Sequence, residues 1–131
     1  MRSSPLPGGQ LEYSVLAALW QLGSASARGV HEIVGRSSAL AYTTTATVLD
    51  RLHAKGLVTR AKVGRAFVYR PRETRETVER ARARRTLRQL LGRDPRPAIA
   101  TLVDAMESID PELLDELGRA VKSRRRVRRG S

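Results

Sequence analysis

The sequence predicts a mainly α-helical protein that contains one small β-hairpin. Three observations support this fold class. Apolar residues recur every three or four positions through most of the first 55 residues, as in amphipathic helices. The period then shortens to two residues from Leu57 to Val63, as in a strand. After residue 73 the longer period returns, so we expect further helices beyond the hairpin.

The N-terminal part begins with a lead-in and two helices. Residues 1–9 are rich in Ser, Pro and Gly, which indicates a flexible lead-in. An apolar stripe predicts a helix over 10–22, and Gly23 suits the C-terminal cap of that helix. Ser26 can cap a second helix, which we expect over 27–34.

A third helix and a hairpin follow. We expect a loop over 35–38 and a helix over 43–55, after which Gly56 can adopt the left-handed backbone that ends many helices. The alternating strand 57–63 is followed by a short turn at 64–66 and a return strand over 67–70. Strand pairing should stop at the proline in position 71, which has no N–H to donate. We expect Phe67 and Tyr69 to belong to the hairpin core.

The second half of the chain predicts three more helices. A long helix should run from Thr74 to Leu91, with an early part that is almost entirely charged or small. The stretch 92–97 breaks it, and the run Asp110-Pro111-Glu112 is a strong start for the last helix. The apolar faces of the last two helices carry Ile99, Leu102, Val103 and Met106, and Leu113, Leu114, Leu117 and Val121. A basic segment from Lys122 to Arg129 follows, which we expect to be disordered and to raise non-specific affinity for nucleic acid.

Composition restricts the function. The 131 residues include 25 Lys and Arg against 13 Asp and Glu, for a net charge of +12 that attracts polyanions. The chain has no cysteine, which excludes a disulfide scaffold, a thiolate metal site and a cysteine nucleophile. No apolar run approaches the roughly 20 residues that cross a bilayer, and the lead-in lacks the apolar core of a signal peptide. We therefore expect a cytoplasmic protein with no membrane partner.

The order helix, helix, helix, hairpin is the layout of a winged helix-turn-helix, in which the third helix reads DNA. A projection of that helix places four residues on the side that should be buried: Thr45, Val48, Leu49 and Leu52. The opposite side carries Thr43, Thr47, Asp50 and Ala54, and Thr44 and Arg51 flank it. Threonine and arginine can bond base edges or phosphates, and we expect Asp50 to pair with a neighbouring cation.

Seven residues are the candidate contacts to DNA. The third helix supplies Tyr42, Thr43, Thr44, Thr47 and Arg51. The hairpin tip supplies Lys62 and Arg65, with Arg60 nearby, and cations on a wing can meet a backbone or a minor groove. One winged helix covers only a half-site, so two copies would place their reading helices about 34–36 Å apart, one turn of duplex.

The sequence resembles the penicillinase-repressor family, bacterial winged-helix repressors that include the methicillin-resistance repressor. The resemblance is tightest from Leu40 to Val58, where Tyr-Thr-Thr precedes Val-Leu-x-Arg-Leu and Lys-Gly-Leu-Val. It continues through the hairpin over 64–71, and begins earlier at Leu11 to Trp20 and Val30 to Ile33. It covers residues 9–72 well and is weaker over 73–122.

The resemblance implies a homodimer on a palindromic DNA operator, with the C-terminal helices as the dimer interface. It implies repression of genes for antibiotic resistance or related stress responses, relieved when a sensor-linked protease cuts the repressor. The characterised members carry an Asn-Phe pair at the cleavage site, whereas residues 100–104 read Ala-Thr-Leu-Val-Asp. A copper-responsive branch uses C-terminal cysteines, and the absence of cysteine excludes that mechanism here.

We therefore predict a sequence-specific transcriptional repressor in four parts. These are a lead-in (1–9), a winged helix-turn-helix (10–72), a helical dimerisation region (73–122) and a basic tail (123–131).

Two other function classes are less well supported. His31 and His53 are the only histidines and show no metal-ligand spacing, and no catalytic triad or phosphate-binding glycine loop is present, so we expect no enzyme, metal or cofactor. An RNA-binding or architectural protein acting through its Arg-rich segments remains the alternative, although RNA readers usually expose stacking aromatics.

Overall fold

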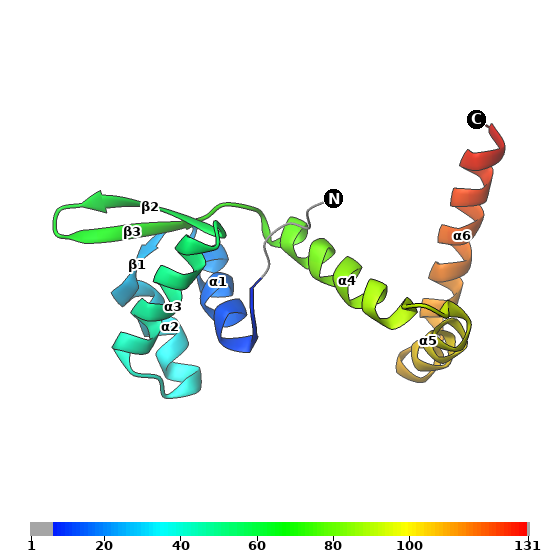
Figure 1. The fold of residues 1–131 in the computed structure, drawn as a ribbon, viewed down its shortest axis with the longest axis horizontal. Coiled ribbons are helices and arrows are strands. Elements are labelled where there is room, and N and C mark those ends of the chain that lie inside the picture. The colour runs from blue at the N-terminus through cyan, green and yellow to red at the C-terminus, as the bar shows by residue number, and fades with distance from the viewer. Residues whose placement is uncertain (1–6, 131) are drawn as a thin grey trace. The chain divides into compact units, whose positions relative to one another are not determined.

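The computed structural model describes residues 7–130, which form two compact units divided between Arg84 and Arg85 (Figure 1). The first unit contains α1 (Gln10–Leu22), β1 (Ala25–Ser26), α2 (Ala27–Ser38), α3 (Tyr42–Ala54), β2 (Val58–Val63), β3 (Ala66–Pro71) and the beginning of α4 (Arg75–Leu91). The second unit contains the end of α4, α5 (Pro95–Ile109) and α6 (Glu112–Gly130). The expected fold class, mainly helical with a small hairpin, is confirmed.

The sheet of the first unit has three antiparallel strands in the order β1-β3-β2. The hairpin was expected, and its register pairs Val63 with Ala66 around a tight turn. Gly64 in that turn has a φ of 63°, a backbone conformation that glycine adopts without steric cost. The pairing ends at Pro71, as predicted. The two-residue strand β1, which pairs with β3, was not expected from the sequence because it is too short to show a period.

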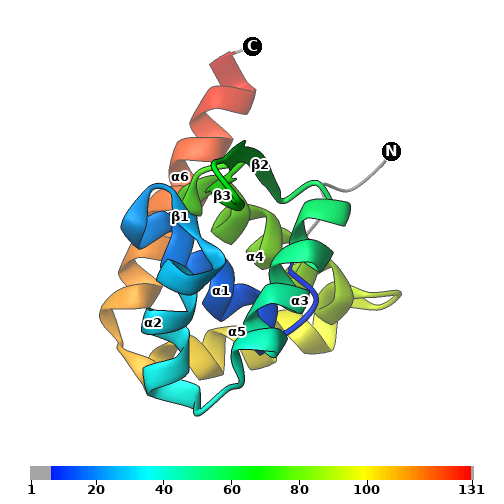
Figure 2. The same cartoon turned by 90° about the vertical axis from the view of Figure 1, so that its left-hand side faces the viewer.

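The core of the first unit lies between α1, α2, α3 and the sheet, where the helices pack around one another (Figure 2). Its buried apolar residues are Val15, Leu16, Ala18, Leu19, Val30, Val34, Val48, Leu49, Leu52, Leu57, Val58, Tyr69 and Val78. Aliphatic side chains therefore supply nearly all of this core.

Helix α2 begins as predicted but ends later. The side chain of Ser26 accepts a hydrogen bond from the Gly29 N–H at 3.2 Å, so it caps the helix. The expectation of a loop over 35–38 is wrong, because the helix continues through Ser38. Ala39 ends it with left-handed backbone at a φ of 49° and donates its N–H to the carbonyl of Gly35. Alanine therefore fills a position where glycine or asparagine is more usual.

Helix α3 matches its predicted range within one residue at each end. Gly56 follows it with a φ of 79°, which confirms the expected left-handed position. The turn leads directly into β2, and the Leu57 N–H donates to the Leu52 carbonyl at 3.0 Å. Helix α3 and the hairpin are thus joined by a short, hydrogen-bonded turn.

The first turns of α4 pack against α1. Val78 is buried in the core, and the indole N–H of Trp20 donates to the Glu73 carbonyl at 2.9 Å. The Arg82 guanidinium lies 4.0 Å from the centre of the Tyr13 ring, and the hydroxyl of Tyr13 donates to Glu79. Within the first unit, this largely charged stretch is therefore held to α1 by aromatic side chains of that helix.

The second unit has no buried residue in α5 or α6, although the two helices contact each other. The Asp94 carboxylate caps α5 by accepting a hydrogen bond from the Arg96 N–H. The Asp110 carboxylate accepts one from the Glu112 N–H and caps α6, as the run Asp110-Pro111-Glu112 predicted. The expectation of a disordered basic tail is wrong, because α6 continues to Gly130. Cations near a helix C-terminus are favoured by the helix dipole, which suits this extension.

Two expectations concern the remaining parts of the chain. Of the lead-in, residues 1–6 lie outside the described residues, and residues 7–9 precede α1 without regular structure. Among residues 7–130, no helix is long and apolar enough to span a membrane.

Candidate nucleic-acid interface

Helix α3 has one buried and one exposed face. The four residues predicted to anchor it, Thr45, Val48, Leu49 and Leu52, are all at most 2% exposed. On the other side Thr43, Thr47 and Arg51 are exposed, and Thr44 is half-buried. The predicted division of the helix is therefore confirmed, and its outward surface carries short polar groups and one arginine.

Four of the candidate residues lie around one shallow hollow. It is lined by Leu11, Thr43, Thr44, Thr47, Val48 and Arg51. The Thr47 hydroxyl donates to the Thr43 carbonyl at 2.9 Å, so its proton is already used within the helix. Its lone pairs remain able to accept a hydrogen bond, for example from an amino group of adenine or cytosine. In this rotamer Thr47 can therefore act on a base as an acceptor.

A buried carboxylate holds the end of α3 to α1. Glu12 accepts hydrogen bonds from the Lys55 ammonium at 2.7 Å and from the Gly8 N–H at 2.9 Å. The Arg51 guanidinium lies 3.8 Å from the same carboxylate, while 53% of the Arg51 side chain stays exposed. Burial opposes ionisation of Glu12, but these hydrogen bonds and charges outweigh it and hold its pKa below the ordinary value. Glu12 therefore faces both Lys55 and Arg51 at this end of α3.

Tyr42 lies at the first turn of α3, next to α2. Its ring meets the His31 ring edge-on with centroids 5.7 Å apart, and His31 bonds the buried hydroxyl of Thr45 at 2.8 Å. The Arg28 guanidinium lies 5.6 Å from the Tyr42 ring centre. Arg28 was not among the candidates, because nothing in the sequence shows that the start of α2 comes close to the start of α3.

The hairpin separates its cations into two groups. Lys62 and Arg65 are exposed near the turn, as predicted, and the hairpin extends beyond the three helices in Figure 1. Arg60, expected with them, instead pairs with Asp50 of α3 at 3.0 Å. The pairing predicted for Asp50 is thus confirmed, and Arg60 connects the hairpin to α3.

One of the two expected hairpin core residues is misassigned. Tyr69 is 5% exposed and belongs to the core, whereas Phe67 is 38% exposed. The Arg60 guanidinium lies over the Phe67 ring at 4.2 Å from its centre, a cation–π contact. The two-residue period of the strand could not show that Phe67 and Tyr69 differ in burial, because positions 67 and 69 share one side of the strand. Phe67 lies closer to the exposed end of the hairpin.

A second hollow gathers residues from α2, α3 and β3. Its polar and aromatic lining includes Arg28, Tyr42, Asp50, Arg65 and Phe67. The structure thus brings Tyr42 and Arg65 to one groove, and the threonines and Arg51 to the other, whereas Lys62 lines neither. Both grooves border α3 and carry cations, an arrangement that suits a polyanion with a regular backbone.

The described residues at this surface form no cluster of metal-ligating side chains. Among residues 7–130, no three His, Asp or Glu side chains gather closely enough to hold a metal ion. His31 is engaged with Thr45, a buried threonine of the reading helix. The exposed groups around the two hollows are hydroxyls, guanidinium groups and the Asp50 carboxylate, which is paired with Arg60.

Comparison with known proteins identifies the family. A family model described as Penicillinase repressor matches residues 8–123. The transcriptional regulator BlaI of Mycobacterium tuberculosis, in strains CDC 1551 / Oshkosh and ATCC 25618 / H37Rv, is 34% identical over 114 residues. These residues cover 86% of this chain and 81% of the relative. The solution structure of the DNA-binding domain of the repressor BlaI is 30% identical, with a TM-score of 0.49, and covers 53% of this chain and 87% of that domain.

The resemblance inferred from the motifs around α3 is therefore confirmed, and the family consists of repressors and not of enzymes. The chain belongs to the penicillinase repressor family and is a DNA-binding transcriptional repressor with a winged-helix fold.

Proposed function

We propose that this repressor binds a palindromic DNA operator as a homodimer, with α3 of each copy in a major groove. The observation that carries the proposal is the division of α3 into a fully buried side and an exposed side of threonines and Arg51. A helix anchored in this way can present short polar groups to base edges without loosening the core.

The candidate residues take different roles in this proposal. Arg51 can bond guanine O6 and N7, and Thr43 and Thr47 can contact base edges or a thymine methyl group. Lys62 and Arg65 of the wing contact the sugar-phosphate backbone or enter the minor groove. Tyr42 and Thr44, from the first turn of α3, contact the phosphates beside the groove, because the start of a helix suits an anion.

The exposed apolar surface of the second unit supports a homodimer. Ile99 and Ile109 of α5 are 52% and 77% exposed, and Val121 of α6 is 40% exposed. Neither helix has a buried residue, although both carry an apolar stripe. Such surfaces usually mark an interface, and two-fold pairing of identical chains is the commonest assembly. A palindromic operator follows from that symmetry.

Selection of bound sequences from a random duplex pool tests this proposal. We expect inverted half-sites whose centres lie about 10–10.5 base pairs, or a multiple of that, apart. Enrichment of a single unrepeated site would contradict the dimer, and no enrichment at all would contradict sequence-specific binding.

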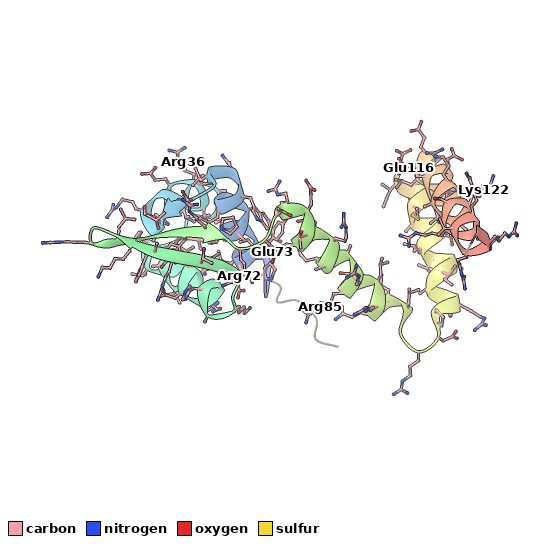
Figure 3. All side chains as sticks on the ribbon, turned by 90° about the horizontal axis from the view of Figure 1, so that it is seen from above. Arg36, Arg72, Glu73, Arg85, Glu116 and Lys122 are labelled. Carbon is pink, nitrogen blue, oxygen red and sulfur yellow. The ribbon has the colours of Figure 1, made fainter. Side chains whose placement is uncertain are left out.

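A pair of alanine variants tests the role of Arg51. We expect Arg51→Ala to weaken operator binding by about 1–3 kcal/mol while barely changing binding to unrelated duplex. Arg36→Ala is the matched control, because Arg36 is an exposed arginine in the last turn of α2 and lines neither groove (Figure 3). Equal losses on both DNAs would make Arg51 a phosphate contact.

We further propose that the regulated genes serve antibiotic resistance or a related stress response, and that a sensor-linked protease acts at a site other than residues 100–104. That segment lacks an Asn-Phe pair and lies inside α5, where Leu102 and Val103 are half-buried. Intact-mass measurement of the repressor before and after antibiotic exposure tests the second statement. A fragment ending elsewhere supports it, and cleavage within 100–104, or a chain that stays intact during induction, contradicts it.

A further inference from the structure

The C-terminal part of α6 carries a concentration of positive charge on a continuous helix. Six of the eight residues from Lys122 to Arg129 are cations, five of them arginines, and none is acidic. Every residue in this stretch is exposed. Within the described part of the chain, none of the six cations forms an ion pair with a carboxylate.

The charges of α6 are segregated along its length. Its acidic residues, Glu112, Asp115 and Glu116, all lie in the first two turns, and Figure 3 labels Glu116 there and Lys122 where the basic part begins. A helix dipole favours this polarity, but its effect falls off within the last turn, which holds only Arg128 and Arg129 of these cations. The number of arginines therefore exceeds what helix stability requires.

The spacing of these cations is unfavourable within the isolated chain. Lys122 and Arg126, Arg124 and Arg128, and Arg125 and Arg129 are each four residues apart, so like charges lie next to one another on the helix surface. The set Lys122, Arg125, Arg126 and Arg129 forms one face, following the helical spacing of three and four residues. A polyanion laid along this face would replace repulsion by attraction.

The same part of α6 is unsuited to the apolar interface. The stripe Leu113, Leu114, Leu117 and Val121 stops at Val121, and Arg124 and Arg128 take the next positions of that stripe. The apolar face of α6 therefore ends near Lys122, where its basic segment begins. One helix thus presents two chemically different surfaces in succession.

We propose that the basic segment of α6, residues 122–129, binds the phosphate backbone of duplex DNA without regard to sequence. Arginine is well matched to phosphate, because its planar guanidinium can donate two parallel hydrogen bonds. Residues 85–130 contain no aromatic side chain and no histidine, so this unit lacks the aromatic platform on which RNA readers usually stack unpaired bases. A membrane is also disfavoured, because interfacial helices insert Trp, Phe or Leu and this segment has only Val127.

The inference rests on the proposed function only in that both involve duplex DNA. It concerns a second contact, whose strength should depend on salt and not on the sequence of the duplex. Counterion release makes the logarithm of the binding constant fall with the logarithm of salt concentration, with a slope of about −0.9 per phosphate contacted.

The test compares the full chain with the triple variant R125Q/R126Q/R129Q on a mixed-sequence duplex between 50 and 200 mM salt. The affinity of both proteins should fall over that range. If each arginine contacts one phosphate, the fall should be roughly 40-fold smaller for the variant than for the wild type, counted per chain bound. Glutamine keeps the helix propensity, and circular dichroism checks that α6 persists. The charge-retaining variant R125K/R126K/R129K should keep the slope of the wild type.

The variant R84Q/R85Q/R88Q is the matched control, because it removes the same charge from exposed positions of α4. An equal change of slope in this control, or an unchanged slope in the α6 variant, would overturn the inference. Tighter binding to phosphatidylglycerol vesicles than to duplex at equal phosphate concentration would assign the segment to a membrane and overturn it as well.

The two proposals fail differently. Failure of sequence-specific binding would appear as a wild type that does not prefer its selected operator. Failure of the present inference leaves that preference intact and the salt slope of the α6 variant unchanged.

Discussion

The two units of this repressor differ in how they bury apolar surface. The first closes a core of its own, with residues from three helices, the sheet and the start of α4. The second has apolar stripes of similar length on α5 and α6 but buries no residue in either helix. The difference teaches that a hydrophobic pattern predicts which face of a helix is apolar, but not which part of the protein or which partner packs against that face. In the first unit the cover is the same chain, and for the second we propose another copy.

Truncation of a core residue should have the largest effect. Leu49 is 0% exposed, so Leu49→Ala should lower the free energy of unfolding of the first unit by about 2–5 kcal/mol, through lost burial and the cavity left behind. Denaturant unfolding followed by circular dichroism measures this loss. The loss should not depend on protein concentration, and dependence on concentration would show that the first unit also needs a partner.

The corresponding change in the second unit should act through assembly. Leu117 is half-buried on the apolar stripe of α6, and Leu117→Ala should weaken the dimer by about 1.5–3 kcal/mol if a second copy buries it fully. Sedimentation equilibrium measures the dissociation constant. Arg119→Ala, an exposed change on another face of the same helix, is the control. An unchanged constant in the leucine variant would remove α6 from the interface.

Loss of the buried carboxylate should have an intermediate, pH-dependent effect on the first unit. Glu12→Gln should cost about 1.5 kcal/mol at pH 7, because Lys55 and the Gly8 N–H lose a charged acceptor. The pKa of Glu12 is depressed in the folded chain, so its stabilisation is present above the ordinary value of 4.5 and disappears as pH falls through the lower folded value. Thermal unfolding of both proteins from pH 7 to pH 3 measures this. A difference that does not shrink as pH falls would contradict the assignment.

The smallest effect on stability is expected where the wing joins α3. Asp50 is largely exposed, so Asp50→Ala should change the free energy of unfolding by less than about 1 kcal/mol. It should nevertheless release Arg60 and loosen the hairpin, which amide hydrogen exchange across β2 and β3 measures. Arg65→Ala at the turn is the control. Equal exchange rates in wild type and Asp50→Ala would show that the Phe67 contact alone holds Arg60.

Local rules predicted most of the fold of the first unit. The cap at Ser26, the left-handed position of Gly56 and the two faces of α3 each depend on neighbouring residues in the chain, so the sequence shows them. The two-residue strand β1 and the docking of α4 on α1 depend on contacts between distant segments. Neither has a periodic pattern, which is why the sequence did not reveal them.

The same distinction explains what the sequence could say of the interface. The exposed threonines and Arg51 follow from helical spacing alone. The contact of Arg28 with Tyr42, the pairing of Arg60 with Asp50 and the buried position of Glu12 all join different elements. The basic end of α6 was expected to be disordered but is helical, and the favourable position of cations at a helix C-terminus suits that outcome.

Trp20 is the only tryptophan in the chain, and its indole is bonded to the Glu73 carbonyl and lies beneath Arg75 at 5.5 Å. The repressor therefore has one intrinsic tryptophan fluorophore, which lies where α1 contacts the beginning of α4. Intrinsic fluorescence excited at this single site will register any release of α4 from the DNA-binding unit, with no label attached. The method can follow the protein in real time while operator DNA or an inducing signal is added.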